Sequence, residues 1–423
     1  MFKEFKAMLL ALVLAGHGGF ASGQARQLSI DSCYALARKY YPLTEQQGLI
    51  DLSRDYTLGN IQTGHLPQLS LQGRASYQSD VTRLPVHLAG VSIPELSKDQ
   101  YRISAELTQN IYDGGEMRDR ASLARAESGV RSQQLEVRLY TLTGRVNELF
   151  FGILLLHEQL AENGLYLRDI RLGIDKAAAA VKNGAALPSS RDVLEAEFLE
   201  ASQRQALLSG ERTAYARMLG AFIHRDLPDS VVLIAPPVPA DTGRITRPEL
   251  DLFSGRDHLL AAEQQLAGTE SRPKVGLFLD AGAGRPGLDM LDNSFRGYYV
   301  GGISVTVPIS AFYTLKRKKE LIGLERRSLA TERETFLFDT REQLTRADDQ
   351  IRTLREMLAS DERIVTLRNR IRKASLAQLE NGVITSDDYL RRVHQADQAA
   401  RRRAYHQVEL LMTRYARRNQ AGQ

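Results

Sequence analysis

No group of residues in this 423-residue sequence has the types and spacing of a known catalytic site. The eight histidines are scattered, and none stands in an H-E-x-x-H or similar metal-ligand spacing. No serine lies in a nucleophile elbow, and Gly282-Ala283-Gly284 falls within a candidate strand instead of opening a helix, which argues against a phosphate cradle. We therefore expect no enzyme activity, no cofactor and no metal site.

Cysteine and charge suggest little further chemistry. Cys33 is the only cysteine, so an internal disulfide is excluded, and we expect a buried helical thiol. The net charge is +5, and the basic runs at 316–319 and 401–403 could in principle contact phosphates. Neither run is interleaved with aromatic residues, so solvated helix faces or a membrane-proximal rim are the favoured interpretation, and no nucleic-acid partner is expected.

The N-terminus has the pattern of an export signal. Lys3 and Lys6 precede an apolar stretch at 8–16, and small residues at 21–23 form a cleavage site. Residues 1–23 are therefore predicted to be a signal peptide, and no cysteine follows that could carry a lipid. The longest later apolar run, 149–156, is far shorter than the ~20 residues of a transmembrane helix, so no helical span is expected.

The remainder of the chain is an internal duplication. Matching residues are separated by 198 positions over about eighty residues: Tyr101/Tyr299, Ile111/Ile309, Leu123/Leu321, Glu127/Glu325, Glu136/Glu334, Leu139/Leu337, Asn183/Asn381 and Gly184/Gly382. We predict a first repeat at 24–220, a Pro-rich linker at 221–246 and a second repeat at 247–423. Each repeat is expected to contain two strands and two long helices.

The four predicted strands alternate apolar and polar residues. They are placed at about 68–78, 101–111, 274–283 and 298–309, each of the length of a tilted transmembrane β-strand. One apolar and one hydrophilic face is typical of a barrel with lipid outside and water inside. Alternation alone fits the half-buried strands of a soluble sheet equally well. The export signal and the strand length favour the membrane.

The helices carry a heptad pattern. In the first repeat its apolar positions are Leu135, Leu139, Leu142, Val146, Leu149, Ile153, Leu156 and Leu160. The pattern predicts a helix at 116–182 that breaks at Gly184 and returns at 190–219. The second repeat is predicted to have helices at 313–380 and 386–418, with a break at Asn381-Gly382 where glycine permits a left-handed backbone. The fold class expected is mainly α, with antiparallel coiled coils and a β part in the membrane.

Four strands cannot close a membrane barrel, because about eight is the smallest spanning number. An open edge in lipid would leave backbone groups without partners. Several copies of the chain must then pool their strands, and the physical function that follows is a conduit. The alternative is a soluble periplasmic coiled-coil scaffold or adaptor whose strands form a small sheet.

Four segments resemble the TolC-type outer-membrane efflux proteins. They are LSIDSCYALARKYYP, LPQLSLQGRASY, QNIYDGGEMRDRA and NGVITSDDYL, in the order of that family and with its duplication. The resemblance implies a homotrimer with a twelve-stranded barrel in outer-membrane lipid, continuing into a helical tunnel in the periplasm of a Gram-negative bacterium. It further implies a tripartite efflux or type I secretion system, in which a periplasmic adaptor and an inner-membrane transporter dock on the tunnel tips.

The resemblance also implies roles for residues at the two tips. Tip and adaptor contacts are expected at Gly184, Asp192, Val193, Leu194, Gly382, Val383, Tyr389 and Leu390. Asp387 and Asp388 could form a ring of entrance carboxylates that attracts cations, or Asp388 could act as an N-cap of the returning helix. The Tyr and Arg that lock the entrance of the best-known member would fall near Leu379 and Ile384, so that lock is absent.

The remaining site is the junction of strand and helix. Ile111 is expected to end the lipid-facing stripe, with Tyr112 in an aromatic girdle. Asp113 and Glu116 have the spacing of a capping box, and Gly114 and Gly115 would let the backbone turn. The second junction has Pro308 in place of glycines, so the two junctions are predicted to bend differently.

Overall fold

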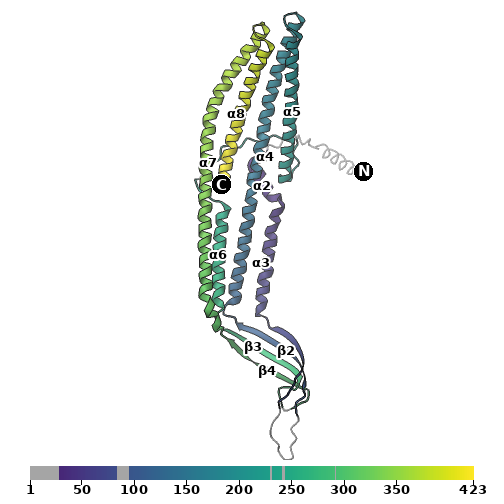
Figure 1. Cartoon of the computed structure of the whole chain (residues 1–423), viewed down its shortest axis with the longest axis vertical. Coiled ribbons are helices and arrows are strands. Elements are labelled where there is room, and N and C mark those ends of the chain that lie inside the picture. Colours follow the sequence, from purple (N-terminus) through teal and green to yellow (C-terminus); the bar gives the residue numbers. More distant parts are fainter. Residues whose placement is uncertain (1–27, 83–94, 229–230, 241–242, 291) are drawn as a thin grey trace, which may run out of the picture. The chain divides into compact units, whose positions relative to one another are not determined.

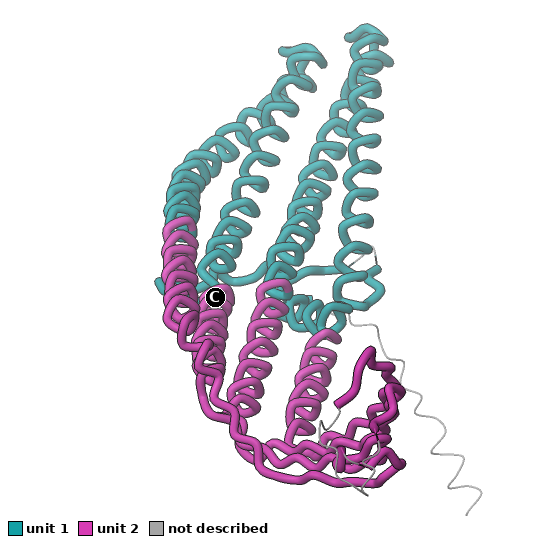
Figure 2. Tube along the Cα trace, turned by 60° about the horizontal axis from the view of Figure 1, so that its bottom comes forward, with its two compact units in different colours: residues 1–44, 139–246, 340–423 teal, residues 45–138, 247–339 magenta. Residues whose placement is uncertain are grey.

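The computed structural model describes residues 28–82, 95–228, 231–240, 243–290 and 292–423, so the predicted signal peptide lies outside the described residues. The chain divides into two compact units, coloured separately in Figure 2. Unit 1 takes in the described residues up to Thr44, Leu139–Thr246 and Thr340–Gln423, and unit 2 takes in Glu45–Arg138 and Arg247–Asp339. Each unit draws on both halves of the chain. The compact units therefore do not coincide with the two sequence repeats, whose boundaries stay a prediction.

Unit 2 contains a four-stranded antiparallel sheet in the order β1-β2-β3-β4 (Figure 1). The strands are β1 Gln68–Tyr77, β2 Asp99–Tyr112, β3 Lys274–Arg285 and β4 Arg296–Thr306. Strand β4 ends just before Pro308, which has no N–H group to donate to a ladder. Among the described residues, β1 and β4 each have one neighbouring strand, so the sheet has two open edges.

The register places apolar residues of all four strands on one face of the sheet. Leu71, Ala105, Ala281 and Tyr299 form one row across the strands, because each is paired with the next. The face is exposed in the single chain: Leu71 keeps 74% of its accessible surface and Ile303 keeps 69%. A soluble sheet would cover such residues, so this face requires an apolar surrounding.

A β-bulge at the end of β2 shifts the pattern by one residue. The register passes from Asn110 opposite Gly276 to Tyr112 opposite Val275, so Ile111 is the extra residue. Without the bulge Tyr112 would fall on the polar face, because side chains alternate along a strand. With it, Tyr112 shares the apolar face of Val275 at the end of the sheet.

The helices of unit 2 are α3 Gln46–Gln62, α6 Pro248–Thr269 and the first parts of α4 (Glu116–Lys182) and α7 (Phe312–Glu380). Short 3-10 turns flank them: η1 Pro42–Glu45, η2 Thr63–His65 and η3 Ile309–Ala311. Helices α6 and α7 are joined by a two-pronged ion pair, since both carboxylate oxygens of Asp257 accept from Arg326 at 2.7 and 2.8 Å. Such fork-like pairs fix orientation better than single contacts do.

Unit 1 contains α2 Ile30–Tyr40, α5 Pro188–Ile223, α8 Ser386–Ala421 and the remaining parts of α4 and α7. Its first apolar core gathers residues of α2, α4, α5, α8 and the segment at 233: Leu28, Ile30, Cys33, Ala37, Val146, Phe150, Phe151, Ile153, Ala216, Leu219, Ile223, Leu233 and Tyr415. A second core lies toward the helix turns and contains Tyr166, Ile170, Ile174, Ala177, Leu194, Ala201, Tyr389 and Val393.

The heptad positions of α4 turn inward as the pattern predicts. Leu142, Val146 and Ile153 are completely or almost completely buried. By length and composition α4 is the one helix of the described chain that could cross a membrane, and core helices of soluble proteins pass the same test. Its apolar run at 149–156 supplies Phe150, Phe151 and Ile153 to the first core. Cys33 is the expected buried thiol, and burial raises its pKa to about 12.

Candidate functional site: helix tips and strand-to-helix junctions

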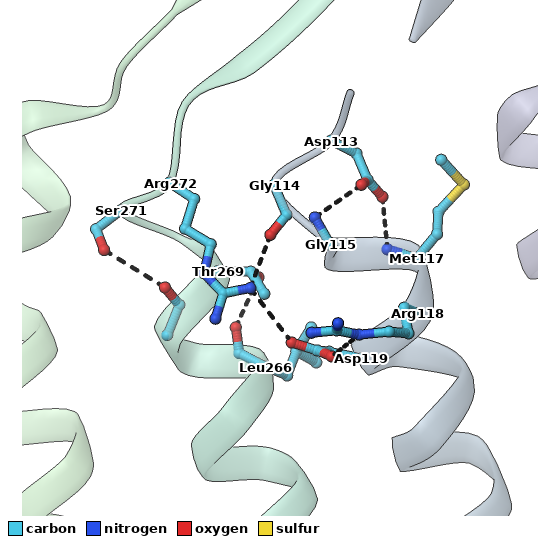
Figure 3. A network of polar contacts seen from close by, with 11 residues as sticks. Asp113, Gly114, Gly115, Met117, Arg118, Asp119, Leu266, Thr269, Ser271 and Arg272 are labelled. Atoms are coloured by element: carbon cyan, nitrogen blue, oxygen red, sulfur yellow. Dashed lines mark hydrogen bonds and ion pairs between the residues drawn. The ribbon is translucent and has the colours of Figure 1, made fainter. Parts of the chain in front are cut away.

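The first junction begins with Asp113, whose carboxylate holds the start of α4 (Figure 3). One carboxylate oxygen accepts from the Gly115 N–H at 2.8 Å and the other from the Met117 N–H at 2.6 Å. Partial burial raises the pKa of Asp113, but the hydrogen bonds from Met117 and Gly115 outweigh it, so the net pKa lies below its usual value. Asp113 thus satisfies N–H groups that the first helical turn leaves without partners.

Two left-handed glycines make the turn between β2 and α4. Gly114 has φ +73° and Gly115 has φ +85°. A side chain at Gly114 would also collide, because an added Cβ would lie 2.8 Å from Arg272 Cβ. At Gly115 the nearest atom would be the Arg272 guanidinium nitrogen at 3.2 Å, which a flexible side chain can move away. Gly114 is therefore the stricter of the two positions.

Arg272 fixes this turn from the chain segment before β3. Its guanidinium donates to the Gly114 carbonyl at 2.8 Å and lies 3.7 Å from the buried carboxylate of Asp119. The carboxylate of Glu116 pairs with Lys274 and Arg120, and the Lys274 bond is the main cause of its lowered pKa. The expected reciprocal capping box is therefore wrong in its second half, because the side chain that should return to residue 113 is held by two cations.

The second junction is built differently, as the sequence predicted. Pro308 has φ −80° and ψ 84°, and the turn η3 connects it to the start of α7 at Phe312. Backbone hydrogen bonds hold the turn, with the Ala311 N–H donating to the Pro308 carbonyl at 3.1 Å, and the Thr314 hydroxyl donates to the Ala311 carbonyl at 3.4 Å. No left-handed residue occurs at this junction.

The turn between α4 and α5 closes on Gly184, which has φ +72°. The Ala185 N–H donates to the Ala180 carbonyl at 2.8 Å, the long bond of a Schellman-type helix end. Helix α5 then starts with Pro188, and the preceding Leu187 offers no side-chain cap. Asp192, predicted to mark this tip, is exposed on α5 and lies 3.6 Å from Arg191.

The turn between α7 and α8 repeats the glycine and adds a complete capping box. Gly382 has φ +67°, and the Val383 N–H donates to the Gln378 carbonyl at 2.8 Å. Thr385 is the N-cap. Its hydroxyl oxygen accepts from the Asp388 N–H at 3.1 Å, and the Asp388 carboxylate accepts from the Thr385 N–H at 3.4 Å. The alternative with Asp388 itself as N-cap is therefore wrong by three residues.

Two of the predicted tip residues are buried within unit 1. Leu194 is 0% and Tyr389 is 1% exposed, and both belong to the second core. The Tyr389 ring lies so close to Gly173 of α4 that a Cβ there would be 2.6 Å from it. Gly184, Val193, Gly382 and Val383 are exposed, and Leu390 is half-buried. The buried pair has no surface for a partner and can act only through packing.

Two ion pairs tie α4 to α7 just before the tips, and sequence reasoning missed both. Arg372 pairs with the Asp169 carboxylate, and Lys176 lies 2.5 Å from Glu380. The Tyr389 hydroxyl adds α8 to this set by donating to the Asp169 carbonyl at 2.8 Å. We expected no Tyr–Arg lock near Leu379 and Ile384. That expectation did not consider these two ion pairs, which join the same helices close to those positions. The two residues of each ion pair are some two hundred positions apart in the sequence, so no local motif predicts the pairing.

A second polar group crosses between α4, α5 and α8. The Tyr166 hydroxyl donates to Glu197 at 2.6 Å, and the Arg204 guanidinium lies 5.8 Å from the Tyr166 ring centre. The buried carboxylate of Asp397 lies 3.7 Å from Arg204 and 2.5 Å from Arg401. Burial raises the pKa of Asp397 although both arginines act to lower it. Charged groups therefore connect the two helical hairpins inside unit 1.

No described residues gather into a group of three or more His, Cys, Asp or Glu that could hold a metal ion. The arrangement of the site is mechanical: two capped turns at the tips, two hinged turns at the sheet, and polar ties between the helices.

Comparison with known proteins gives one family and one fold. The model of the family described as outer membrane efflux protein matches residues 53–218. No match is found among curated protein sequences. The solved structure of the outer-membrane channel OprN is similar with a TM-score of 0.68 and 13% identity, covering 93% of this chain and 89% of that one.

Two further structures agree. The outer membrane protein VceC of Vibrio cholerae is similar with a TM-score of 0.67 and 12% identity, covering 93% of this chain and 96% of that one. The open state of the MtrE outer membrane channel of Neisseria gonorrhoeae has a TM-score of 0.65 and 15% identity, with 93% and 88% covered. At these identities the solved structures show the fold, and the family match covers residues 53–218. Together they agree with the resemblance read from the sequence: residues 53–218 match the outer membrane efflux protein family, and the chain has the fold of these outer-membrane channels.

Proposed function

We propose that three copies of this chain pool their four-stranded sheets into one twelve-stranded barrel. The observation that carries the proposal is the sheet itself, which has two open edges among the described residues and one exposed apolar face. In lipid an unpaired edge would cost several kcal/mol for each backbone group without a partner. Pairing β1 of one copy with β4 of the next removes both edges.

The barrel would form a passive conduit, because the opposite face of the sheet is polar. Gln72 donates to Glu106 at 3.2 Å on this face, and Asp280 is paired directly with Glu106. Small and charged residues that alternate with lipid-facing ones are typical of a water-filled lumen. We propose no catalytic step, since transport through such a channel needs only a path.

The tips are the proposed docking sites of a periplasmic adaptor and an inner-membrane transporter in a tripartite efflux or type I secretion system. Val383 directly follows Gly382, and Val193 lies in the second turn of α5; both are exposed apolar residues and, with the exposed Gly184 and Gly382, offer contact surface. Asp192 and Leu390 flank them. Leu194 and Tyr389 are proposed to support the tips from the core.

Asp387 and Asp388 are proposed as the entrance carboxylates. Arg391 pairs with Asp388 and lies 3.7 Å from Asp387, so one cation in each copy already offsets part of the charge. The pKa of Asp388 is lowered by hydrogen bonds from the Thr385 hydroxyl and Arg391, so the carboxylate stays ionised at neutral pH. A ring of three such pairs would favour cations weakly.

Extraction and conductance test the proposed conduit. The protein should leave isolated membranes only with detergent and should then insert into planar bilayers with a reproducible single-channel conductance. Release by salt or carbonate alone, without any conductance, would favour the soluble scaffold or adaptor and overturn the proposal. Replacement of the tip glycine, Gly382→Leu, should leave the conductance-forming assembly intact while export by cells is lost. Normal export would count against docking at this tip.

A further inference from the structure

An arginine-rich pocket lies in unit 1, and none of its residues belongs to a tip or a junction. It has a volume of about 200 Å³ and is lined by residues of α7 and α8, the segment at 238–240 and Gln423. Its ionisable lining residues are Arg352, Arg355, Arg414, Arg417, Arg418 and Asp348. Five guanidinium groups thus line the pocket, and Asp348 is the only lining residue with an acidic side chain. Asp241 follows the segment in the sequence but belongs to the part that the structure leaves out of its description.

Three of the arginines have a nearby acid. Arg417 donates hydrogen bonds to both carboxylate oxygens of Asp348, at 2.5 and 3.2 Å. Arg352 pairs with Asp349 on its own helix, and Arg418 lies 3.8 Å from Asp31 while it covers the Tyr415 ring. The acids near Arg352 and Arg418 are outside the pocket, so they do not fill it.

Arg355 and Arg414 are the uncompensated pair. Neither has a carboxylate within ion-pair distance among the described residues, and the Nε atom of Arg414 is buried without a hydrogen-bond partner. Burial lowers the pKa of Arg414, and the charge of Arg355 lowers it further. Two cations held close together with an unused donor are costly unless an anion joins them.

We propose that this pocket binds a compact, multiply charged oxyanion of the phosphate type, either free or as the phosphate group of a larger molecule. Guanidinium groups recognise the planar faces of such oxyanions with paired hydrogen bonds, and they do so better than lysine. A dianion balances the two charges that Arg355 and Arg414 leave open. The pocket is also much larger than the about 10–15 Å³ that a single water needs.

This site is independent of the conduit function, because its residues lie outside the sheet, the junctions and the tips. An acidic side chain of a second copy could supply the same chemistry in the assembled channel. Such a side chain would occupy the pocket permanently and leave no room for a free anion. The test below separates a site for a free anion from a contact between copies.

The experiment is calorimetric titration of the full-length protein, purified in detergent and in phosphate-free buffer of low ionic strength. Inorganic phosphate and glycerol phosphate are the two probes, and the variants are Arg355→Gln and Arg414→Gln. The matched control is Arg363→Gln, an exposed arginine of the same helix with the same loss of charge. Low salt matters because ions screen such contacts.

We expect saturable binding that falls at least tenfold in either pocket variant and is unchanged in the control. Binding of both probes identifies a phosphate group on a larger molecule as an acceptable ligand, and binding of inorganic phosphate alone restricts the site to the free ion. Without ligand, Arg355→Gln should raise the thermal midpoint, since it removes the like-charge neighbour of Arg414.

Two results would overturn the proposal. One is no saturable binding of either probe, which is also the outcome expected if a second copy fills the pocket. The other is binding that the control reduces as much as the pocket variants do. Arg355 is exposed, so its variant should fold and keeps the test valid even if Arg414→Gln does not fold.

Discussion

Replacing Gly114 by alanine should open the junction between β2 and α4. The left-handed backbone, φ +73°, costs an alanine roughly 1–2 kcal/mol. The new Cβ would meet Arg272 Cβ at 2.8 Å, and overpacking of this kind costs typically about 1–3 kcal/mol. Alanine also lowers the conformational entropy of the unfolded chain, which offsets about 0.4–1 kcal/mol of this destabilisation. The net loss should be about 2–4 kcal/mol.

Hydrogen exchange at the Met117 and Gly115 amides measures this loss directly, because both N–H groups are held by the Asp113 carboxylate. A loss of 2–4 kcal/mol corresponds to faster exchange by a factor of roughly 30 to 1,000, since each 1.4 kcal/mol is tenfold. Gly115→Ala should have the smaller effect, because its Cβ meets only the movable ends of the Arg272 and Arg118 side chains.

Gly129→Ala is the control within α4. Its Cβ would meet nothing within 4 Å, and alanine in a helix interior is favoured over glycine by about 1 kcal/mol, so exchange should slow or stay unchanged. Equal effects at Gly114 and Gly115 would refute the argument from close approach. An effect at Gly129 as large as that at Gly114 would refute the whole account of the hinge.

Three further predictions concern the helices and the first junction. Arg372→Gln leaves the partly buried Asp169 without its cation, so the helix ends should separate more often and the mean conductance in planar bilayers should rise; Arg370→Gln, exposed on the same helix, should not change it. A raised pKa means that folded Asp397 binds its proton more tightly than the unfolded chain does, so acidification from pH 7 toward 4 should stabilise the wild type relative to Asp397→Asn. The lowered pKa of Asp113 acts in the opposite direction: its stabilisation is present above the ordinary value of 3.8 and lost as the pH falls below it, and wild type should lose stability relative to Asp113→Asn. Urea midpoints measured from pH 7 to well below 3.8 test both, and equal slopes would contradict the assignment.

Periodic features of the fold were accessible from the sequence. The heptads of α4 and the alternation of β1 to β4 follow from the spacing of apolar residues, and Gly184 and Gly382 follow from the backbone that a helix end requires. The bulge at Ile111 was not accessible, because an extra residue in a ladder depends on the partner strand β3 and not on β2 alone.

The candidate site was predicted less completely, for a related reason. Asp113 was identified from its position before a helix, but Glu116 is turned away by Lys274, which is 158 residues distant. The pair of Arg372 with Asp169 joins helices whose register is set by the whole of unit 1. Contacts of this kind depend on tertiary packing, and one sequence without its fold carries no signal for them. The exposure of Val383 and the burial of Tyr389 likewise become visible only when the hairpins are packed.

The central claim is that one chain supplies four strands of a shared barrel, and native mass spectrometry of the detergent-released protein tests it most directly. The account predicts a particle of three copies, which gives twelve strands and no open edge. A particle of two copies would give eight strands, keep the conduit and contradict the trimer. A single chain, stable and alone in the detergent, would leave both edges of the sheet unpaired and contradict the account.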